Sequence, residues 1–226
     1  GGTLYVAGGS DITVTGTITV TGASTILMQS KNNILQVEGQ WQGAGATLRA
    51  GNIQVDADSK INADGQGYVG VGPGASGGYN IGASYGGRGS GGSVSTYGSA
   101  LTPLDLGSGG TSLPSTGGGA IRLIVSGTLT NNGTISANGA SDTYTSGASG
   151  GSIHVTTGTL TGGGIFTANG YPGYYSQGGG GRVAVYYRIN SGFTGFATST
   201  TTGSENGSIA FIDNSQTSNR LYVYKQ

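Results

Sequence analysis

The chain has no cysteine and only one histidine, and these two scarcities exclude several chemistries at once. Without cysteine there are no disulfides, no thiolate metal ligands and no cysteine nucleophile. A single imidazole excludes every metal site or mechanism that needs two of them. That histidine, His154, stands in a repeated segment whose other copies have Arg122 and Ala184. We therefore expect it to face outward at a replaceable position.

Charge is also scarce, at 8% of residues, with nine basic and nine acidic side chains and a net charge of zero. Nucleic acids and anionic membranes attract proteins through clustered Lys and Arg, so we expect neither as a partner. No apolar run approaches the roughly 18 residues that a membrane-spanning helix needs. Membrane insertion is therefore not expected either.

Glycine is abundant, with 50 of 226 residues. Ordering glycine costs more backbone entropy than ordering any other residue. An ordered chain of this composition must therefore turn often or bring stretches of backbone into close approach. The low charge, the single Met and the many Thr, Ser and Tyr residues predict an extracellular or cell-surface location.

A repeated block runs through the second half of the chain. Its copies are GGAIRLIV at 118–125, GGSIHV at 150–155, GGRVAVYY at 180–187 and GSIAFI at 207–212. GTLT and then ANG follow each of the first two copies, and an earlier copy at 53–65 leads into a long glycine-rich loop, 65–119. Self-similarity at a period of about 20–50 residues indicates units that stack on one another.

The fold class follows from the pattern inside each unit. Apolar and polar residues alternate, as in the run from Ile12 to Thr15, which is typical of strands. Asn-Gly and Asp-Gly pairs mark turns, and no segment has a helical pattern. We predict an all-β chain, and favour a parallel β-helix (solenoid) with long glycine-rich loops, because such units bury their apolar face only when stacked. A β-sandwich built from hairpins is the alternative.

The expected organisation is a single solenoid domain over residues 1–226. It comprises N-terminal coils at 1–50, glycine-rich repeats at 51–212 with the long loop 65–119, and a terminal strand at 213–226.

Blocks such as GGSIHV and GGGGRVAVYY, alternating with GTLT and ANG, resemble the glycine-rich β-helical repeats of large bacterial and archaeal secreted or cell-surface proteins. The resemblance covers roughly residues 51–212. It implies an extracellular location and a scaffold or adhesive role. It carries no catalytic residues to this chain.

Tyrosines recur in the glycine-rich loops, and two interpretations are open for them. Exposed tyrosine faces stack well on sugar rings, which would make the chain an adhesin or a carbohydrate-binding module with polysaccharide as its partner. Alternatively, the tyrosines cover the flank of the stack and fix the loops in place. The candidate glycan-binding residues are Tyr79, Tyr85, Tyr171, Tyr174 and Tyr175.

Three acidic residues, Asp56, Asp58 and Asp64, are weak candidates for a calcium site. With Arg49 and Lys60 beside them they also raise a minor alternative, a calcium-dependent polysaccharide lyase. We name no catalytic residue and expect no enzymatic activity. Calcium is the one cofactor that the sequence leaves open.

Apparent strands lie at both ends of the chain, without a capping helix or a charge cluster. Either the chain is a piece of a longer solenoid, or its open strand edges pair with neighbouring copies. The second interpretation predicts a non-enzymatic extracellular structural protein that assembles with copies of itself into a filament or surface layer. The predicted contact residues are Leu4, Tyr5, Val6, Leu221, Tyr222, Val223 and Tyr224.

Overall fold

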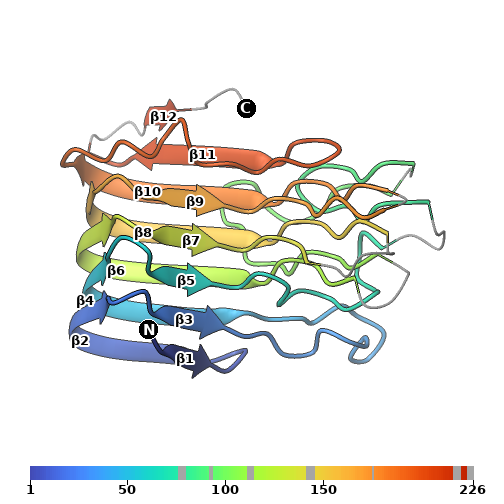
Figure 1. Ribbon diagram of the computed structural model, residues 1–226, viewed down its shortest axis with the longest axis horizontal. Helices are drawn as coiled ribbons and strands as arrows, with labels where there is room; N and C mark the ends of the chain where they lie inside the picture. The colour runs from blue at the N-terminus through green and yellow to red at the C-terminus, as the bar shows by residue number, and fades with distance from the viewer. Residues whose placement is uncertain are drawn as a thin grey trace.

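A computed structural model describes residues 1–75, 80–91, 94–110, 115–140, 146–174, 176–215 and 220–222. Within these ranges every regular element is a β-strand and there is no helix (Figure 1). The pairing of the strands divides them into two sheets.

The larger sheet has seven strands. In spatial order they are β2 (Asp11–Val20), β4 (Ala46–Val55), β6 (Ala120–Asn131), β8 (Ser152–Thr161), β10 (Arg182–Asn190), β11 (Ser208–Asp213) and β12 (Arg220–Tyr222). The smaller sheet has five, β1 (Thr3–Val6), β3 (Thr25–Met28), β5 (Lys60–Asn62), β7 (Thr134–Ser136) and β9 (Ile165–Thr167). All pairs in both sheets are parallel except β11 with β12, so the larger sheet is mixed.

From β1 to β10 the chain enters the two sheets in turn, so neighbouring strands of one sheet are separated in sequence by a strand of the other. This path places the repeated blocks side by side in register. Ile153 of β8 pairs with Ile121 of β6 and with Val183 of β10. Val183 pairs in turn with Ile209 of β11. The sequence repeat is therefore a repeat of strand positions.

The prediction of a parallel β-helix is wrong. The two sheets stay open and do not close into a solenoid, and their arrangement fits a β-sandwich. The connections on the right in Figure 1 are glycine-rich, and their described residues hold isolated bridges but no strand. Glycine weakens strands because it has no side chain to pack, so these connections add no further sheet. Among the described strands only β11 and β12 form an antiparallel pair, so the other strands do not form the hairpins that we expected of a sandwich.

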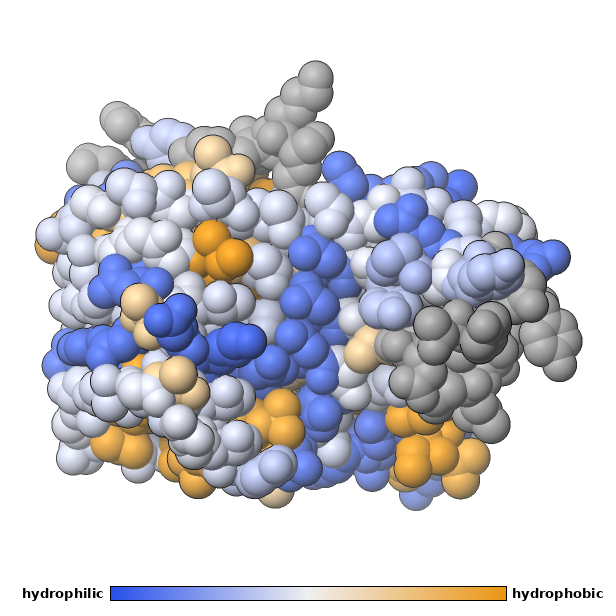
Figure 2. All heavy atoms as spheres, viewed as in Figure 1, coloured by the Kyte–Doolittle hydropathy of each residue, from blue (hydrophilic) through white to orange (hydrophobic). Residues whose placement is uncertain are grey.

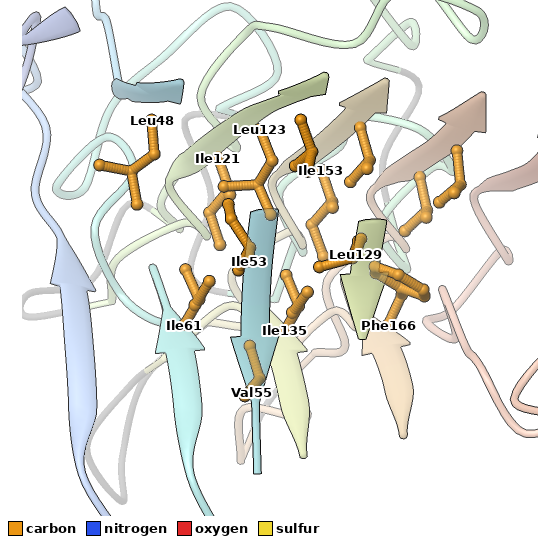
Figure 3. Packing of buried hydrophobic residues seen from close by; sticks show 14 of the residues in the cluster. Leu48, Ile53, Val55, Ile61, Ile121, Leu123, Leu129, Ile135, Ile153 and Phe166 are labelled. Atoms are coloured by element: carbon orange, nitrogen blue, oxygen red, sulfur yellow. The ribbon is translucent and has the colours of Figure 1, made fainter. Parts of the chain in front are cut away.

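The main core lies between the two sheets (Figure 3). Residues that share a register position form apolar rows across the strands. In the smaller sheet one such row is Ile61, Ile135 and Phe166, all fully buried. Fully burying a side chain of this size contributes about 1.5–3 kcal/mol, so these rows are the main apolar stabilisation of the stack.

The glycine-rich connections pack backbone against backbone, as expected from the composition. Gly107 donates its N–H to the carbonyl of Gly118 at 2.8 Å, and Gly150 donates to Gly179 at 3.0 Å. Side chains at these positions would separate the segments. Backbone hydrogen bonds between glycines thus order these connections, together with a small apolar cluster of Tyr68, Leu106 and Ala120.

Candidate functional site: the open strand edge

One end of the sandwich is formed by β1 and β2, at the bottom of Figure 1. Among the described residues no strand pairs with the outer edge of either, so each presents unpaired backbone groups there. Between them lies a cavity of about 420 Å³ with Leu4, Ile18, Val20 and Ile26 in its lining. At this end the core is open to solvent.

Apolar side chains gather toward this end. Leu4 is 61% exposed although its register partner Ile26 is buried, because no further strand covers it. Figure 2 shows hydrophobic side chains along the lower edge, the side on which Figure 1 draws β1 and β2. Half of the exposed large hydrophobic residues that the structure describes fall before residue 38, namely Leu4, Tyr5, Ile12, Ile34, Leu35 and Val37.

The opposite end is closed. β12 pairs antiparallel with β11, from Phe211 with Tyr222 to Asp213 with Arg220. Below it, Phe193 and Phe196 fill the end of the core, with the Phe196 ring 4.8 Å from that of Phe211. Such aromatic clusters bury large apolar areas, so the core itself is not accessible at this end.

The predicted contact strands thus have different positions. Residues 3–6 form β1, the edge of the smaller sheet, with Val6 buried and Leu4 and Tyr5 exposed. Leu221 and Tyr222 belong to β12, the edge of the larger sheet, while Val223 and Tyr224 lie outside the described residues. The sequence interpretation missed β2, which is the longer of the two edge strands at the open end.

An ion pair lies on the outward face beside this edge. Arg49 of β4 donates from Nε and Nη2 to the two carboxylate oxygens of Asp11 on β2, at 2.7 and 2.9 Å. Hydrogen bonding and the charge of Arg49 lower the pKa of the Asp11 carboxyl. Exposed pairs contribute little to stability, so this one mainly fixes the two outward side chains.

The calcium candidates are not brought together. Asp56 accepts a hydrogen bond from Gln54 at 2.7 Å, and Asp58 is an exposed turn residue with a φ of 64°. Asp64 is half-buried. Among the described residues there is no group of three or more acidic or imidazole side chains placed to hold a metal ion. Arg49, which the lyase hypothesis placed beside these carboxylates, is paired with Asp11.

Asp64 instead begins a row of side-chain acceptors at the corner after the smaller sheet. Its Oδ1 accepts the N–H of Asn138 at 2.6 Å, Asn138 Oδ1 accepts the N–H of Asn169 at 2.8 Å, and Asn169 Oδ1 accepts the N–H of Thr202 at 2.8 Å. Each side chain thereby satisfies a backbone donor of the next repeat. The Asp-Gly and Asn-Gly pairs of the sequence mark this row.

Burial raises the pKa of Asp64, against the lowering effect of hydrogen bonds from Asn138, Ser136 and Asn62. The folded state therefore binds the Asp64 proton more tightly than the unfolded chain, whose pKa is about 3.9. Stability from this proton is present in full below that value and is lost as the pH rises through the folded pKa. We expect the unfolding free energy of the native chain, minus that of Asp64→Asn, to increase on acidification from neutral pH. Urea unfolding of both chains at several pH values measures this difference, and a constant or falling difference would contradict it.

The candidate glycan-binding tyrosines do not form a common surface. Tyr85 is fully buried and cannot stack on a sugar, so its assignment is wrong. Tyr171 is half-buried, Tyr174 is 70% exposed, and Tyr79 and Tyr175 lie outside the described residues. Several loop tyrosines fix loops instead: the Tyr97 hydroxyl donates to the carbonyl of Leu106 at 2.6 Å, and that of Tyr85 lies 2.6 Å from Ser152 Oγ.

A buried arginine, missed in the sequence, holds part of the long loop. Arg182 of β10 donates from Nε and Nη2 to the carbonyl of Tyr97, at 3.1 and 2.9 Å, and from Nη1 to Ser208 at 3.2 Å. Its guanidinium lies 5.4 Å from the centre of the Tyr85 ring. These contacts attach the loop segment around Tyr97 to the outward face of the larger sheet.

His154 neighbours Arg122 and Ala184 in the larger sheet, as the repeat predicts. It is nevertheless buried, because its ring packs edge-on against Tyr186 at 5.7 Å. Burial and the nearby charge of Arg122 lower the pKa of His154. The position is therefore less replaceable than the sequence indicated.

The chain matches no family model, no curated protein and no solved structure. No helix long and apolar enough to cross a membrane occurs in the part of the chain that the structure describes.

Proposed function

We propose that this chain is a non-enzymatic structural protein that associates with copies of itself through its exposed strand edges. The observation that supports the proposal is the open end, where β1 and β2 have unpaired edges beside an uncovered apolar core. Natural sheets usually block such edges with charge, proline, bulges or a covering segment. On β1 and β2 there is no proline and the only charged side chain is Asp11, and the one irregularity is the register shift of β2 against β4 between Val14 and Thr17.

In this proposal the module is a building unit of a filament or surface layer outside the cell. The composition supports the location, through low charge, a single Met and abundant glycine. A polymer needs a second contact, and the outer edge of β12, where Leu221 is 56% exposed, is the candidate for it.

The first test is self-association. Sedimentation velocity from about 1 to 100 µM covers the affinities expected of a modest interface, and we expect the sedimentation coefficient to rise with concentration. Leu4→Lys places a charge at the mouth of the core and should weaken association at least about tenfold. The matched control is Ile189→Lys on the inner strand β10, where a similarly exposed apolar residue, 58%, is replaced. A native chain that stays monomeric throughout would refute the proposal.

A further inference from the structure

The sequence of β2 is symmetric in residue type about Gly16. Counting outward from Gly16, the matched residues are Thr15 and Thr17, Val14 and Ile18, Thr13 and Thr19, Ile12 and Val20, and Asp11 and Thr21. Apolar residues match apolar ones, and threonines match threonines, up to the end of the strand. Only the outermost match joins a charged residue to a neutral one.

The structure shows which face of the sheet each set of matched residues occupies. Ile18 and Val20 pair with Ile53 and Val55, both buried, so the apolar set faces the core. Thr19 pairs with Gln54, which is exposed on the outward face of the sheet. One face of the edge strand therefore carries the apolar side chains and the other carries the threonines, and the pairing of β2 with β4 shifts register between Val14 and Thr17, around Gly16.

We propose that the partner of this edge is β2 of a second copy, paired antiparallel about a two-fold axis at Gly16. This rests on the proposed function, which it deepens by naming the contact strand and its register. In an antiparallel pair centred there, each inward residue lies opposite an inward residue and each threonine opposite a threonine. A shift of one residue would turn threonines toward the joined core.

Two further features fit this pairing. A two-fold contact uses the same patch on both copies, and a strand that is symmetric about its centre meets that requirement along its whole length. The only charged residue of β2, Asp11, would lie opposite Thr21 and not opposite its own copy. At Gly16 a Cβ atom would meet nothing within 4 Å, so a side chain introduced at the centre of the strand meets no steric obstacle.

The absence of native cysteine allows a direct test. Directly opposed residues of an antiparallel pair have Cα atoms about 4.5–5.5 Å apart, within the range of about 4.4–6.8 Å that a disulfide needs. Gly16→Cys should therefore form a covalent dimer under mild oxidation. Thr13→Cys and Thr19→Cys should each fail alone, because each residue lies about 20 Å from its own copy. Mixed together, these two variants should form a disulfide-linked heterodimer.

Non-reducing electrophoresis gives the cross-linked fraction, and sedimentation of the native chain is run in parallel. Native self-association with the cross-linking pattern above supports the register. Self-association without it, or with efficient cross-linking of Thr13→Cys alone, overturns the β2 pairing and leaves the proposed function standing. A monomeric native chain overturns both. Circular dichroism of each cysteine variant shows whether it is folded. If Gly16→Cys does not fold, the mixture of Thr13→Cys and Thr19→Cys, both at exposed positions, still tests the register.

Discussion

Replacing Gly151 by alanine is expected to lower the free energy of unfolding by about 3 kcal/mol or more. Gly151 does not have a positive φ, so alanine tolerates its backbone conformation and the effect comes from packing alone. An added Cβ would overlap the backbone of Gly118 and Gly119. That backbone cannot move aside easily, because the Gly119 carbonyl accepts the N–H of Ser152 at 2.9 Å.

The matched control is Gly163→Ala. Gly163 is exposed, and its added Cβ would meet only Thr194 Oγ1, at an ordinary contact distance of 3.5 Å. We expect its free energy of unfolding to stay within about 0.5 kcal/mol of that of the native chain. Urea unfolding followed by circular dichroism compares the two variants. Equal stability of both would show that the glycine-rich connections are not close-packed.

The strands could be predicted from the sequence because their side chains alternate and their copies repeat. The pairing of Ile121, Ile153 and Val183 follows from aligning the blocks. The choice between a solenoid and two open sheets could not be made in this way. A strand shows the same alternation of apolar and polar residues in either architecture. Glycine-rich segments have no periodic pattern that indicates whether they extend a sheet.

The candidate site was predictable in part. Residues 3–6 do form an edge strand. The symmetry of β2 about Gly16 is visible in the sequence alone, but the sequence interpretation did not include it. The exposure of the loop tyrosines, in contrast, could not be predicted from the sequence. Nothing local distinguishes Tyr85, which is fully buried, from Tyr174, which is 70% exposed, because their burial depends on segments distant in sequence. Loop composition alone therefore does not identify a binding surface.

Removing Arg182 is expected to release the loop segment around Tyr97. Arg182→Ala deletes three hydrogen bonds of a charged donor and a cation–π contact with Tyr85, and leaves the Tyr97 carbonyl without these donors. Hydrogen bonds to charged groups contribute about 1.5–3 kcal/mol each and are not additive, so a loss of about 2–4 kcal/mol is expected. Other hydrogen bonds between this segment and the sheet include that of the Tyr186 hydroxyl to the carbonyl of Leu101, at 2.9 Å, and that of Ser152 Oγ to the carbonyl of Asp105, at 2.6 Å.

Limited proteolysis with mass spectrometry locates the effect, because cleavage follows the population of the locally opened state. We expect new cleavage between residues 94 and 106 in Arg182→Ala, while the β-sheet circular dichroism signal persists at low temperature. Arg188→Ala removes an exposed arginine from the same strand and should leave the cleavage pattern of the native chain. Arg182→Lys keeps the positive charge but removes the planar guanidinium that reaches both Tyr97 and Ser208. This variant therefore tests whether the geometry of the guanidinium, and not its charge alone, holds the segment. Cleavage of Arg182→Ala at the native rate would mean that the segment is held by its own glycine contacts and that the buried guanidinium is dispensable.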